Sequence, residues 1–290
     1  MPEAPLLSNA GLDPTSAIQA VDEYGQLRDL EVAGERPLTL YLDKREIVTL
    51  MTLGQHPEAL TIGYLRNQGL VSSIDDIHAV QVDWDVSAVA VTTVSGTAGQ
   101  SARLDKRTVT TGCGQGTVFG DLMASLETRS LPVVRYRQSM LYELLRAIAD
   151  CNEVYKQAGA VHGCALCQGT RILQFVEDVG RHNAVDAIAG QMWLDGIEGG
   201  DKIFYTTGRL TSEMVIKVAQ IGVPWLLSRS GITRMGLELA RQLGVTLIGR
   251  AKGKHFFVYH GAANLDFDAV PAPRRPVEPR QAGIEPGGGL

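Results

Sequence analysis

The chain has 290 residues, of which 44% are hydrophobic and 20% are charged, and its formal net charge is −5. That length holds one large or two modest domains with an apolar core. The negative balance gives no reason to expect a surface that binds polyanions, so nucleic acid is a poor candidate partner. No stretch is apolar for long enough to cross a membrane, and nothing indicates a secretory signal. The four cysteines are typical of reduced thiols, which predicts a cytoplasmic protein without a disulfide framework.

The first half of the chain is predicted to be rich in strands. Residues 1–36 are polar without a sustained period, and we expect them to be disordered. After them we predict strands at 38–42 and 46–51, a helix from Pro57 to Gly69, and a hairpin of strands at 77–83 and 88–94. These elements belong to a predicted β-rich N-terminal domain over residues 37–131.

A glycine-flanked cysteine lies near the end of this predicted domain. A short β-branched run leads into Cys113, which has Gly112, Gly114 and Gly116 around it. Glycines allow backbone angles that other residues resist, so we expect an exposed loop. Because thiolate chemistry needs exposure and nearby donors, this setting favours a reactive thiol over a structural one. The spacing does not match a dinucleotide-binding fingerprint.

A helix capped by Ser139, with an apolar stripe that includes Cys151 and Tyr155, is predicted to precede two strands at 161–167 and 171–176. The first strand carries His162, Cys164 and Cys167, a spacing that suggests zinc or a dithiol. On a strand, however, residues three apart point to opposite faces and do not readily share a metal or a disulfide. We therefore interpret them as partly buried strand residues and expect no metal site.

The stretch 175–186 concentrates polar side chains at a predicted junction between a strand and a helix. The carboxylates come at the strand's end, and the other polar residues follow on the first turns of the helix: Glu177, Asp178, Arg181, His182, Asn183 and Asp186. His182 and Asp186 are four residues apart and share a helix face. Such a set is larger than a helix cap requires and indicates a site. The alternative is a solvated helix start whose acids complement the helix dipole.

From this junction onward, strands and helices alternate. Strands are predicted at 202–206, 225–228 and 245–249, helices at 211–221 and 233–243, and a hairpin partner at 255–259. Alternation of this kind indicates a mainly parallel sheet covered by helices on both faces. We assign it to an α/β domain over residues 132–262, followed by a disordered tail over 263–290 that is rich in Pro, Arg and Gly.

Three turns of this domain have the composition of phosphate sites. Two lie between a strand and a helix, where backbone amides and the positive end of the helix dipole favour phosphate, and each carries an arginine that can bind phosphate oxygens in a forked geometry. Their residues are Thr207, Gly208 and Arg209, and Ser228, Arg229 and Ser230. A third, basic turn is expected on the same side of the sheet, with residues Arg250, Ala251, Lys252, Gly253, Lys254 and His255. Ordinary helix capping by Thr211 and Thr233 is the alternative for the first two.

Several of these motifs together resemble the formate dehydrogenase accessory sulfurtransferase (FdhD/NarQ) family. They are Val161-His162, the run Glu177-Asp178-Val179-Gly180-Arg181-His182-Asn183-Ala184-Val185-Asp186, Thr207-Gly208-Arg209 with Glu213-Met214, Gly222-Val223-Pro224, and Thr246-Leu247-Ile248-Gly249. The likeness spans roughly residues 36–262. It implies a cytidine-deaminase-like α/β domain, a homodimer, and binding of the molybdenum bis-molybdopterin guanine dinucleotide cofactor, for which GDP is a mimic.

The resemblance also implies roles for particular residues. Cys113 matches the family cysteine that holds a persulfide, and the turn from Arg250 to His255 matches the segment associated with the cofactor. Sulfur would come from a cysteine desulfurase, and the loaded cofactor would go to the catalytic subunit of a formate dehydrogenase. Many members have a second loop cysteine where this chain has Gly116, which excludes a two-thiol relay within the loop.

Three functions follow as hypotheses. The first is a sulfur carrier that uses Cys113. The second is a cofactor chaperone that forms no persulfide. The third is a nucleotide-binding hydrolase or deaminase that works through His162 and the Glu177 cluster, although the paired motifs of a zinc deaminase are absent from the sequence.

Overall fold

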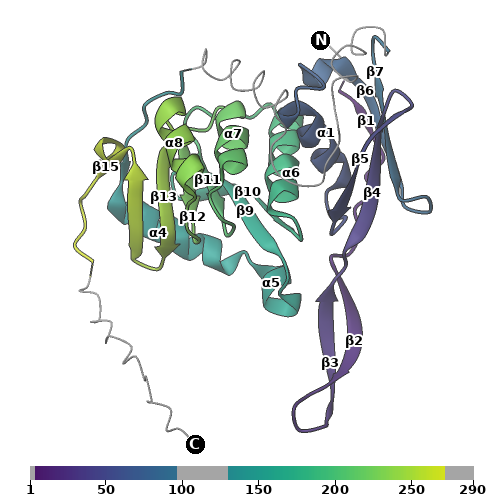
Figure 1. Cartoon of the computed structure of the whole chain (residues 1–290), viewed down its shortest axis with the longest axis horizontal. Helices are drawn as coiled ribbons and strands as arrows, with labels where there is room; N and C mark the ends of the chain where they lie inside the picture. The colour runs from purple at the N-terminus through teal and green to yellow at the C-terminus, as the bar shows by residue number, and fades with distance from the viewer. Residues whose placement is uncertain (1–3, 97–129, 272–290) are drawn as a thin grey trace, which may run out of the picture.

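The computed structural model describes residues 4–96 and 130–271. They form two parts that lie side by side, each built on its own sheet (Figure 1). The chain is thus a mixed α/β protein, as predicted.

The Cys113 loop, Gly116 and the last residues of the tail lie outside the described residues, so the expectations about them stay predictions. No helix within the described ranges is long and apolar enough to cross a membrane.

The N-terminal part is a sheet with one helix on its inner face. Its elements in chain order are β1 (Leu6–Leu7), β2 (Thr15–Val21), β3 (Leu27–Ala33), β4 (Arg36–Leu42), β5 (Arg45–Thr52), α1 (Pro57–Asn67), the 3-10 helix η1 (Ile74–Asp76), β6 (Ile77–Asp83) and β7 (Ala88–Thr93). Five of the strands pair in the order β1-β6-β7-β4-β5. Leu38, Leu40 and Leu42 alternate with more exposed residues and pack into the core with α1, as the two-residue period of a half-buried strand requires.

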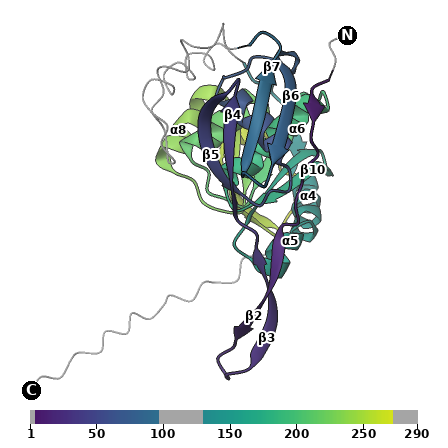
Figure 2. The same cartoon turned by 90° about the vertical axis from the view of Figure 1, so that its right-hand side faces the viewer.

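Strands β2 and β3 form an antiparallel hairpin, residues 15–33, that we call the arm. It extends away from the body of the protein in both views (Figures 1 and 2). The expected disorder over residues 1–36 is therefore wrong for the described residues 4–36. The turn of the arm is set by Asp22, whose carboxylate accepts hydrogen bonds from the backbone N–H groups of Tyr24 and Gln26. The interspersed polar residues hid this pairing in the sequence.

The C-terminal part contains the larger sheet. Its elements are β8 (Tyr136–Arg137), α4 (Gln138–Asp150), α5 (Glu153–Ala158), β9 (His162–Gln168), β10 (Arg171–Asp178), α6 (Arg181–Leu194), β11 (Ile203–Thr206), α7 (Ser212–Gln220), β12 (Trp225–Ser228), α8 (Arg234–Leu243), β13 (Thr246–Lys252), β14 (His255–His260), the 3-10 helix η3 (Ala262–Asn264) and β15 (Leu265–Asp266).

The six strands of the larger sheet lie in the order β10-β9-β11-β12-β13-β14. Only the neighbours β11, β12 and β13 are parallel, whereas β9 and β14 run against their neighbours. The predicted mainly parallel sheet is therefore corrected to a mixed one. The reason is that β9 and β10 form a hairpin through a short turn, and so do β13 and β14, and a short turn joins only antiparallel strands.

Helices cover both faces of this sheet, as predicted. Residues of α6, α7 and α8 share one apolar cluster with one face, and residues of α4 share another with the opposite face. Cys164 belongs to the first cluster and Cys167 to the second. Their predicted placement on opposite faces of β9 is confirmed.

Two local predictions near α4 are corrected. The helix begins after Arg137, and Ser139 does not cap it; its hydroxyl donates instead to Asp268 at 2.6 Å. The helix ends at Asp150, so Tyr155 lies on the separate helix α5 and is 48% exposed. The predicted tail also contains structure in its described part, because β15 pairs with β8 and buries Leu265.

The two parts meet where α1 crosses α6. A Cβ atom on Gly63 would lie 1.7 Å from the carbonyl oxygen of Asp186, and one on Gly190 would lie 1.9 Å from that of Ala59. The two backbones are therefore in direct contact. Beside this crossing, the buried Asp186 carboxylate accepts from Lys217 at 2.6 Å and from Asn67 at 2.7 Å. This part of the predicted polar stretch thus holds three helices together.

Candidate functional site

One edge of the larger sheet gathers most of the residues that the sequence singles out. Strands β10, β11, β12 and β13 all end at this edge, and the antiparallel strands β9 and β14 begin there. His162, the end of β10, the turns after β11 and β12, and the turn between β13 and β14 therefore lie along one line. We call this line the carboxyl edge.

The carboxylates at the end of β10 are held by backbone groups. Glu177 accepts hydrogen bonds from the N–H groups of Val154 and Tyr155 at 2.8 and 3.0 Å, and so fixes the start of α5. Because it accepts from two N–H groups at the start of a helix, its contacts are those of a helix-capping group. The geometry favours the structural alternative for this residue.

Asp178 joins the two parts of the protein. It accepts from the hydroxyl of Thr52 at 2.5 Å, from the N–H of Leu53 at 3.1 Å and from the side chain of Asn183 at 2.8 Å. Burial raises the pKa of this carboxyl, while these donors oppose the shift. Asn183 also donates to the carbonyl of Met51 at 2.6 Å. Asp178 and Asn183 therefore position β5 against the start of α6.

Arg181 and His182, at the start of α6, each have a buried polar atom without a hydrogen-bond partner among the described residues. His182 Nε2 lies 3.2 Å from a carboxylate oxygen of Glu213, in the first turn of α7. Burial, with Lys217 and Arg181 nearby, lowers the pKa of His182 to about 3, so the contact joins a neutral imidazole to a carboxylate. Because a carboxylate only accepts, the proton is on Nε2, and Nδ1 is a bare acceptor. The atoms without a partner in the part of the chain that the structure describes are His182 Nδ1 and Arg181 Nε, and both are buried.

A third unpaired atom lies at the start of α7. Thr211 is the N-cap residue there, but its buried hydroxyl makes no cap hydrogen bond and has no partner within residues 4–96 and 130–271. By contrast, Thr233 caps α8 by accepting from the N–H of Gly236 at 3.2 Å, which is the alternative role that the sequence offered for this residue. Native proteins leave few buried polar atoms unpaired. A donor, an acceptor and a hydroxyl without partners at neighbouring helix starts indicate a place for a polar ligand.

The turn after β11 packs directly on this group. A Cβ atom on Gly208 would lie 2.8 Å from Arg181 Cδ, so glycine permits the close approach. Thr207 accepts from the N–H of Gly163 at 3.0 Å, and its hydroxyl lies 3.5 Å from His162 Nδ1. Burial, together with Arg181 and Arg209, lowers the pKa of His162. This imidazole is therefore held in its neutral form beside the turn.

The turn after β12 is tied to its neighbours by hydrogen bonds. Ser228 donates to the carbonyl of Gly208 at 2.6 Å and accepts from the N–H of Ser230 at 2.8 Å. The carbonyl of Ser230 accepts in turn from the N–H of Arg250 at 2.8 Å. The three predicted phosphate turns are thus one connected backbone unit, and their predicted position on one side of the sheet is confirmed.

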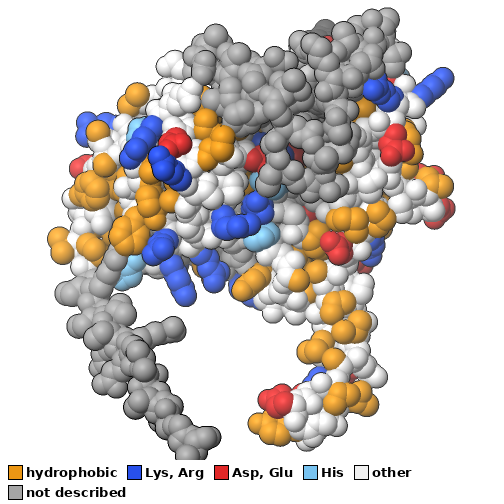
Figure 3. All heavy atoms as spheres, in the orientation of Figure 1, with side chains coloured by type: hydrophobic (Ala, Val, Ile, Leu, Met, Phe, Trp, Pro, Cys, Tyr) orange, Lys and Arg blue, Asp and Glu red, His pale blue; other side chains and the backbone are white. Residues whose placement is uncertain are grey.

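Five cations of these turns are exposed, and none forms an ion pair within the described ranges: Arg209, Arg229, Arg250, Lys252 and Lys254. A row of positive charges without ion-pair partners raises the local concentration of anions. Basic side chains of the C-terminal part are visible in blue in Figure 3. The carboxyl edge therefore suits a ligand with several phosphate groups.

Cysteine chemistry has little support in the described part of the protein. Cys164 donates to the Thr206 hydroxyl at 3.3 Å, and burial raises the pKa of Cys164 and of Cys167 to about 12 each. Cys151 is half-buried, with its pKa also raised by burial. Burial therefore disfavours the thiolate form of all three cysteines. The predicted reactive thiol, Cys113, lies outside the described residues. The described residues contain no group of three or more side chains arranged to hold a metal.

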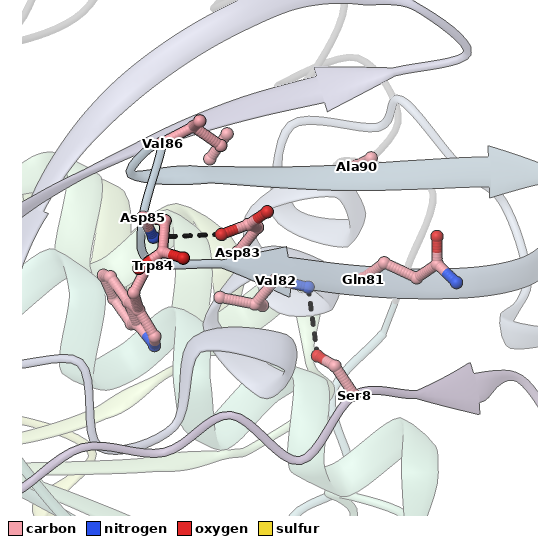
Figure 4. A pocket seen from close by; sticks show the side chains of 9 residues that line it. Ser8, Gln81, Val82, Asp83, Trp84, Asp85, Val86 and Ala90 are labelled. Carbon is pink, nitrogen blue, oxygen red and sulfur yellow. Dashed lines mark hydrogen bonds between the residues drawn. The ribbon is translucent and has the colours of Figure 1, made fainter.

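A hollow of about 610 Å³ lies elsewhere, on the β6–β7 hairpin (Figure 4). Its lining includes Asp83 and Asp85 and no cation. Two carboxylates repel an anionic ligand, so we assign the site to the carboxyl edge rather than to this hollow.

Sequence reasoning missed the part played by Glu213. The residue appears in one of the family-like motifs but carried no expected role. Its position two residues after Thr211, in the first turn of a helix, is the signal that was available.

The fold and the edge together define a class: a mixed α/β protein with a cationic sheet edge and unpaired polar groups at helix starts. The FdhD/NarQ family model matches residues 33–266, so the chain belongs to that family, and the resemblance is confirmed. Most of the arm precedes the matched segment.

Three relatives bear the name "Sulfur carrier protein FdhD". The proteins from Listeria innocua and Bacillus subtilis are each 30% identical to this chain, over 82% and 85% of it and over 94% and 96% of their own lengths. The protein from Bacillus pumilus is 31% identical over 79% of this chain and 88% of its own.

A solved structure from Desulfotalea psychrophila has a similar fold. It is described as a candidate formate dehydrogenase accessory protein. Its TM-score is 0.69 at 27% identity, and the match covers 87% of this chain and 98% of that one.

Proposed function

We propose that this chain is a sulfur carrier that serves a formate dehydrogenase. In this proposal Cys113 accepts sulfur from a cysteine desulfurase and brings it to a molybdenum bis-molybdopterin guanine dinucleotide cofactor bound as cargo at the carboxyl edge. The names of the relatives support the carrier role. The observation that carries the cargo assignment is the set of unpaired polar atoms at Arg181, His182 and Thr211 beside five exposed cations.

The edge accounts for the chemistry of such a cargo. Phosphate oxygens accept hydrogen bonds, which matches the exposed arginines and the Nε–H of Arg181. A guanine base presents N–H donors, which matches the bare acceptor on His182 Nδ1. The catalytic subunit of the formate dehydrogenase would receive the cofactor after sulfur has been added.

The sulfur-accepting step is a thiol exchange. The Cys113 thiolate attacks the outer sulfur of the desulfurase persulfide, so that a new sulfur–sulfur bond forms on Cys113. The sulfur–sulfur bond of the donor breaks, and the desulfurase cysteine leaves as a thiolate. The step transfers one sulfur atom without an added oxidant or reductant.

A cofactor chaperone without persulfide chemistry is the second candidate. The observation that favours it is Gly116, which occupies the position of the second loop cysteine of many family members. Both candidates need the carboxyl edge, and only the first needs Cys113.

Labelled sulfur separates the two candidates. The protein is incubated with a cysteine desulfurase and radiolabelled cysteine, and covalent label is measured after gel separation without reductant. We expect label on the wild type and its complete loss in Cys113→Ala, because burial raises the pKa of each of the other three thiols. Cys151→Ala is the matched control and should keep the label. Equal labelling of the Cys113 variant would leave the chaperone as the function.

A further inference from the structure

The arm is a sheet of only two strands, so each strand has an outer edge without a neighbouring strand. Next to the last pair of the register, the N–H of Asp22 donates to the carbonyl oxygen of Gln26 at 2.9 Å. Hydrogen-bonded and non-hydrogen-bonded pairs alternate in an antiparallel ladder. The backbone groups of Ala17, Gln19 and Val21 therefore point away from β3. Within the described residues, they have no hydrogen-bond partner on another element.

The two outer edges of the arm differ in how they are protected. Proteins protect exposed edges with charged side chains, prolines or very short strands. The strand β3 carries Arg28, Asp29 and Glu31, and it packs beside α5. The strand β2 has seven residues and contains no charge, proline or glycine. The edge of β2 is thus open to pairing with another strand, and the arm extends clear of the body of the protein (Figures 1 and 2).

One face of the arm is apolar and uncovered. In the register Ile18 lies opposite Leu30, and Ser16 lies opposite Val32, so these side chains share a face. The side chains of Ile18, Leu30 and Val32 are 40%, 49% and 38% exposed. A two-stranded hairpin is only marginally stable in water by itself. A third strand beside β2 with apolar side chains on this face would extend the apolar surface and shield it from water.

The opposite face of the arm is acidic. There Ala17 lies opposite Glu31, and Gln19 lies opposite Asp29. The arm as a whole carries four carboxylates and one guanidinium, which gives a net charge of −3. Neighbouring strands lie about 4.8 Å apart. Because Ala17 is small, a long basic side chain on a strand beside β2 extends over it toward Glu31. Charge complementarity therefore favours lysine or arginine on this face of an added strand.

We propose that the outer edge of β2 binds an extended segment of another protein, in which apolar and basic residues alternate. The segment adds a third strand to the arm, and its backbone pairs with that of β2. Its apolar side chains lie beside Ile18, and its basic side chains face the carboxylates of β3. In this mode of recognition the main-chain hydrogen bonds give affinity and the alternating side chains give specificity. Most of the arm precedes the segment that the family model matches, so this binding does not depend on the sulfur-carrier function.

The first test uses the full chain and a fluorescent synthetic peptide in which lysine and valine alternate over the length of β2. We expect saturable binding by fluorescence anisotropy, weakened by salt because the carboxylates contribute to it. A peptide of the same composition, with its lysines in one block and its valines in another, is the control and should bind at least about tenfold more weakly. Absence of binding would overturn the proposal, and so would equal binding of the two peptides, which shows charge attraction alone.

A proline on the edge tests whether the backbone of β2 takes part. Ala17→Pro removes one outward N–H, and proline is tolerated where the N–H of an edge strand faces solvent. We expect binding about tenfold weaker than that of the wild type, whereas Ala17→Thr keeps the N–H and should bind as the wild type does. Slow hydrogen exchange at Ile18 and Leu30, whose amides point into the hairpin, will show that the arm still forms. Equal binding of the two variants would exclude edge pairing. If Ala17→Pro also changes the mass of the protein in sedimentation, a second copy occupies the edge and the proposal is wrong.

A charge variant tests the acidic face without touching the backbone. Asp29→Asn/Glu31→Gln should bind the alternating peptide more weakly than the wild type and with less dependence on salt, because the facing charges are gone. The matched control is Asp83→Asn/Asp85→Asn, which removes the same charge from the β6–β7 hairpin and should bind as the wild type does. An equal loss in both variants would show that the peptide senses only net charge, and the assignment to the arm would fail.

Discussion

His182 is held neutral in the folded protein, and this gives the stability of the protein a specific pH dependence. Its pKa is about 3 in the folded state against 6.5 for a free imidazole. Between these values the unfolded chain binds a proton that the folded chain does not, so stability is complete above pH 6.5 and is lost as the pH falls. At pH 5 the loss amounts to at most about 2 kcal/mol. Urea unfolding at pH 7 and pH 5 measures it.

His182→Gln removes the titrating group and keeps a polar side chain at the same place. Its free energy of unfolding should fall less between pH 7 and pH 5 than that of the wild type. Equal pH dependence of the two proteins would contradict the neutral, buried imidazole and, with it, the bare acceptor on Nδ1.

Arg209 offers a direct probe of the carboxyl edge. It is exposed, it has no ion-pair partner within the described ranges, and it follows the glycine that packs on Arg181. If it binds a phosphate, Arg209→Ala should weaken GDP binding by about 1.5–3 kcal/mol, the scale of a hydrogen bond to a charged group. Calorimetry at low salt measures the affinity. Arg171→Ala, at the opposite end of β10, is the matched control and should bind as the wild type does.

A GDP affinity that is equal in the two arginine variants would remove Arg209 from the site. No binding of GDP to the folded wild type would defeat the placement of the cargo, while leaving the labelling of Cys113 untouched as a separate question.

At the scale of elements, the sequence predicts what depends on neighbours in the chain. The predicted strand at 225–228 matches β12 residue for residue. A short buried run between two turns leaves little choice for the residues at which the strand begins and ends. The direction of β9 was not predictable in this way. A buried apolar run looks the same in a parallel and in an antiparallel pairing, and only the partner strand decides between them.

In the candidate site, too, the sequence predicts what depends on neighbours in the chain and does not predict what depends on distant partners. The sequence placed Glu177, Asp178 and Asn183 at the right junction, but it did not reveal what they bind there. Asp178 accepts from Thr52, which is 126 residues away in the chain, and no local pattern contains that partner. The buried atoms of His182 and Thr211 that have no partner among the described residues likewise become visible only in the folded structure.

The crossing of α1 and α6 makes a sharp prediction. Gly63→Ala would place a Cβ atom 1.7 Å from the Asp186 carbonyl oxygen, so the two helices have to separate. Overpacking of a core costs about 1–3 kcal/mol, and a backbone obstacle places this variant at the upper end. Urea unfolding should show the loss. Gly200→Ala, whose Cβ would meet only an ordinary contact at 3.5 Å, should change stability little. Equal stability of both variants would show that the helices are not in backbone contact.

At the scale of the whole molecule, the net charge of −5 conceals a segregation of charge. The acids of the arm and the cations of the carboxyl edge belong to different halves of the chain, and their sum is all that composition reports. The composition argued against a polyanion-binding surface, because the net charge of the whole chain is negative. The carboxyl edge differs from this average, since it carries five exposed cations. Only the fold places Arg209, Arg229 and Lys252 along one line.

The contact between Gly63 and α6 also bears on how the protein is made. Gly190 follows Gly63 by 127 residues, and ribosomes add about 5–20 residues per second. The helix α1 therefore waits about 6–25 s for the helix that covers it. During that time the face of α1 around Gly63 lacks the α6 backbone that it contacts in the complete fold. The N-terminal part therefore needs α6, from the second half of the chain, to cover α1. A chain truncated before residue 181 should be recovered as aggregate rather than as a folded N-terminal domain.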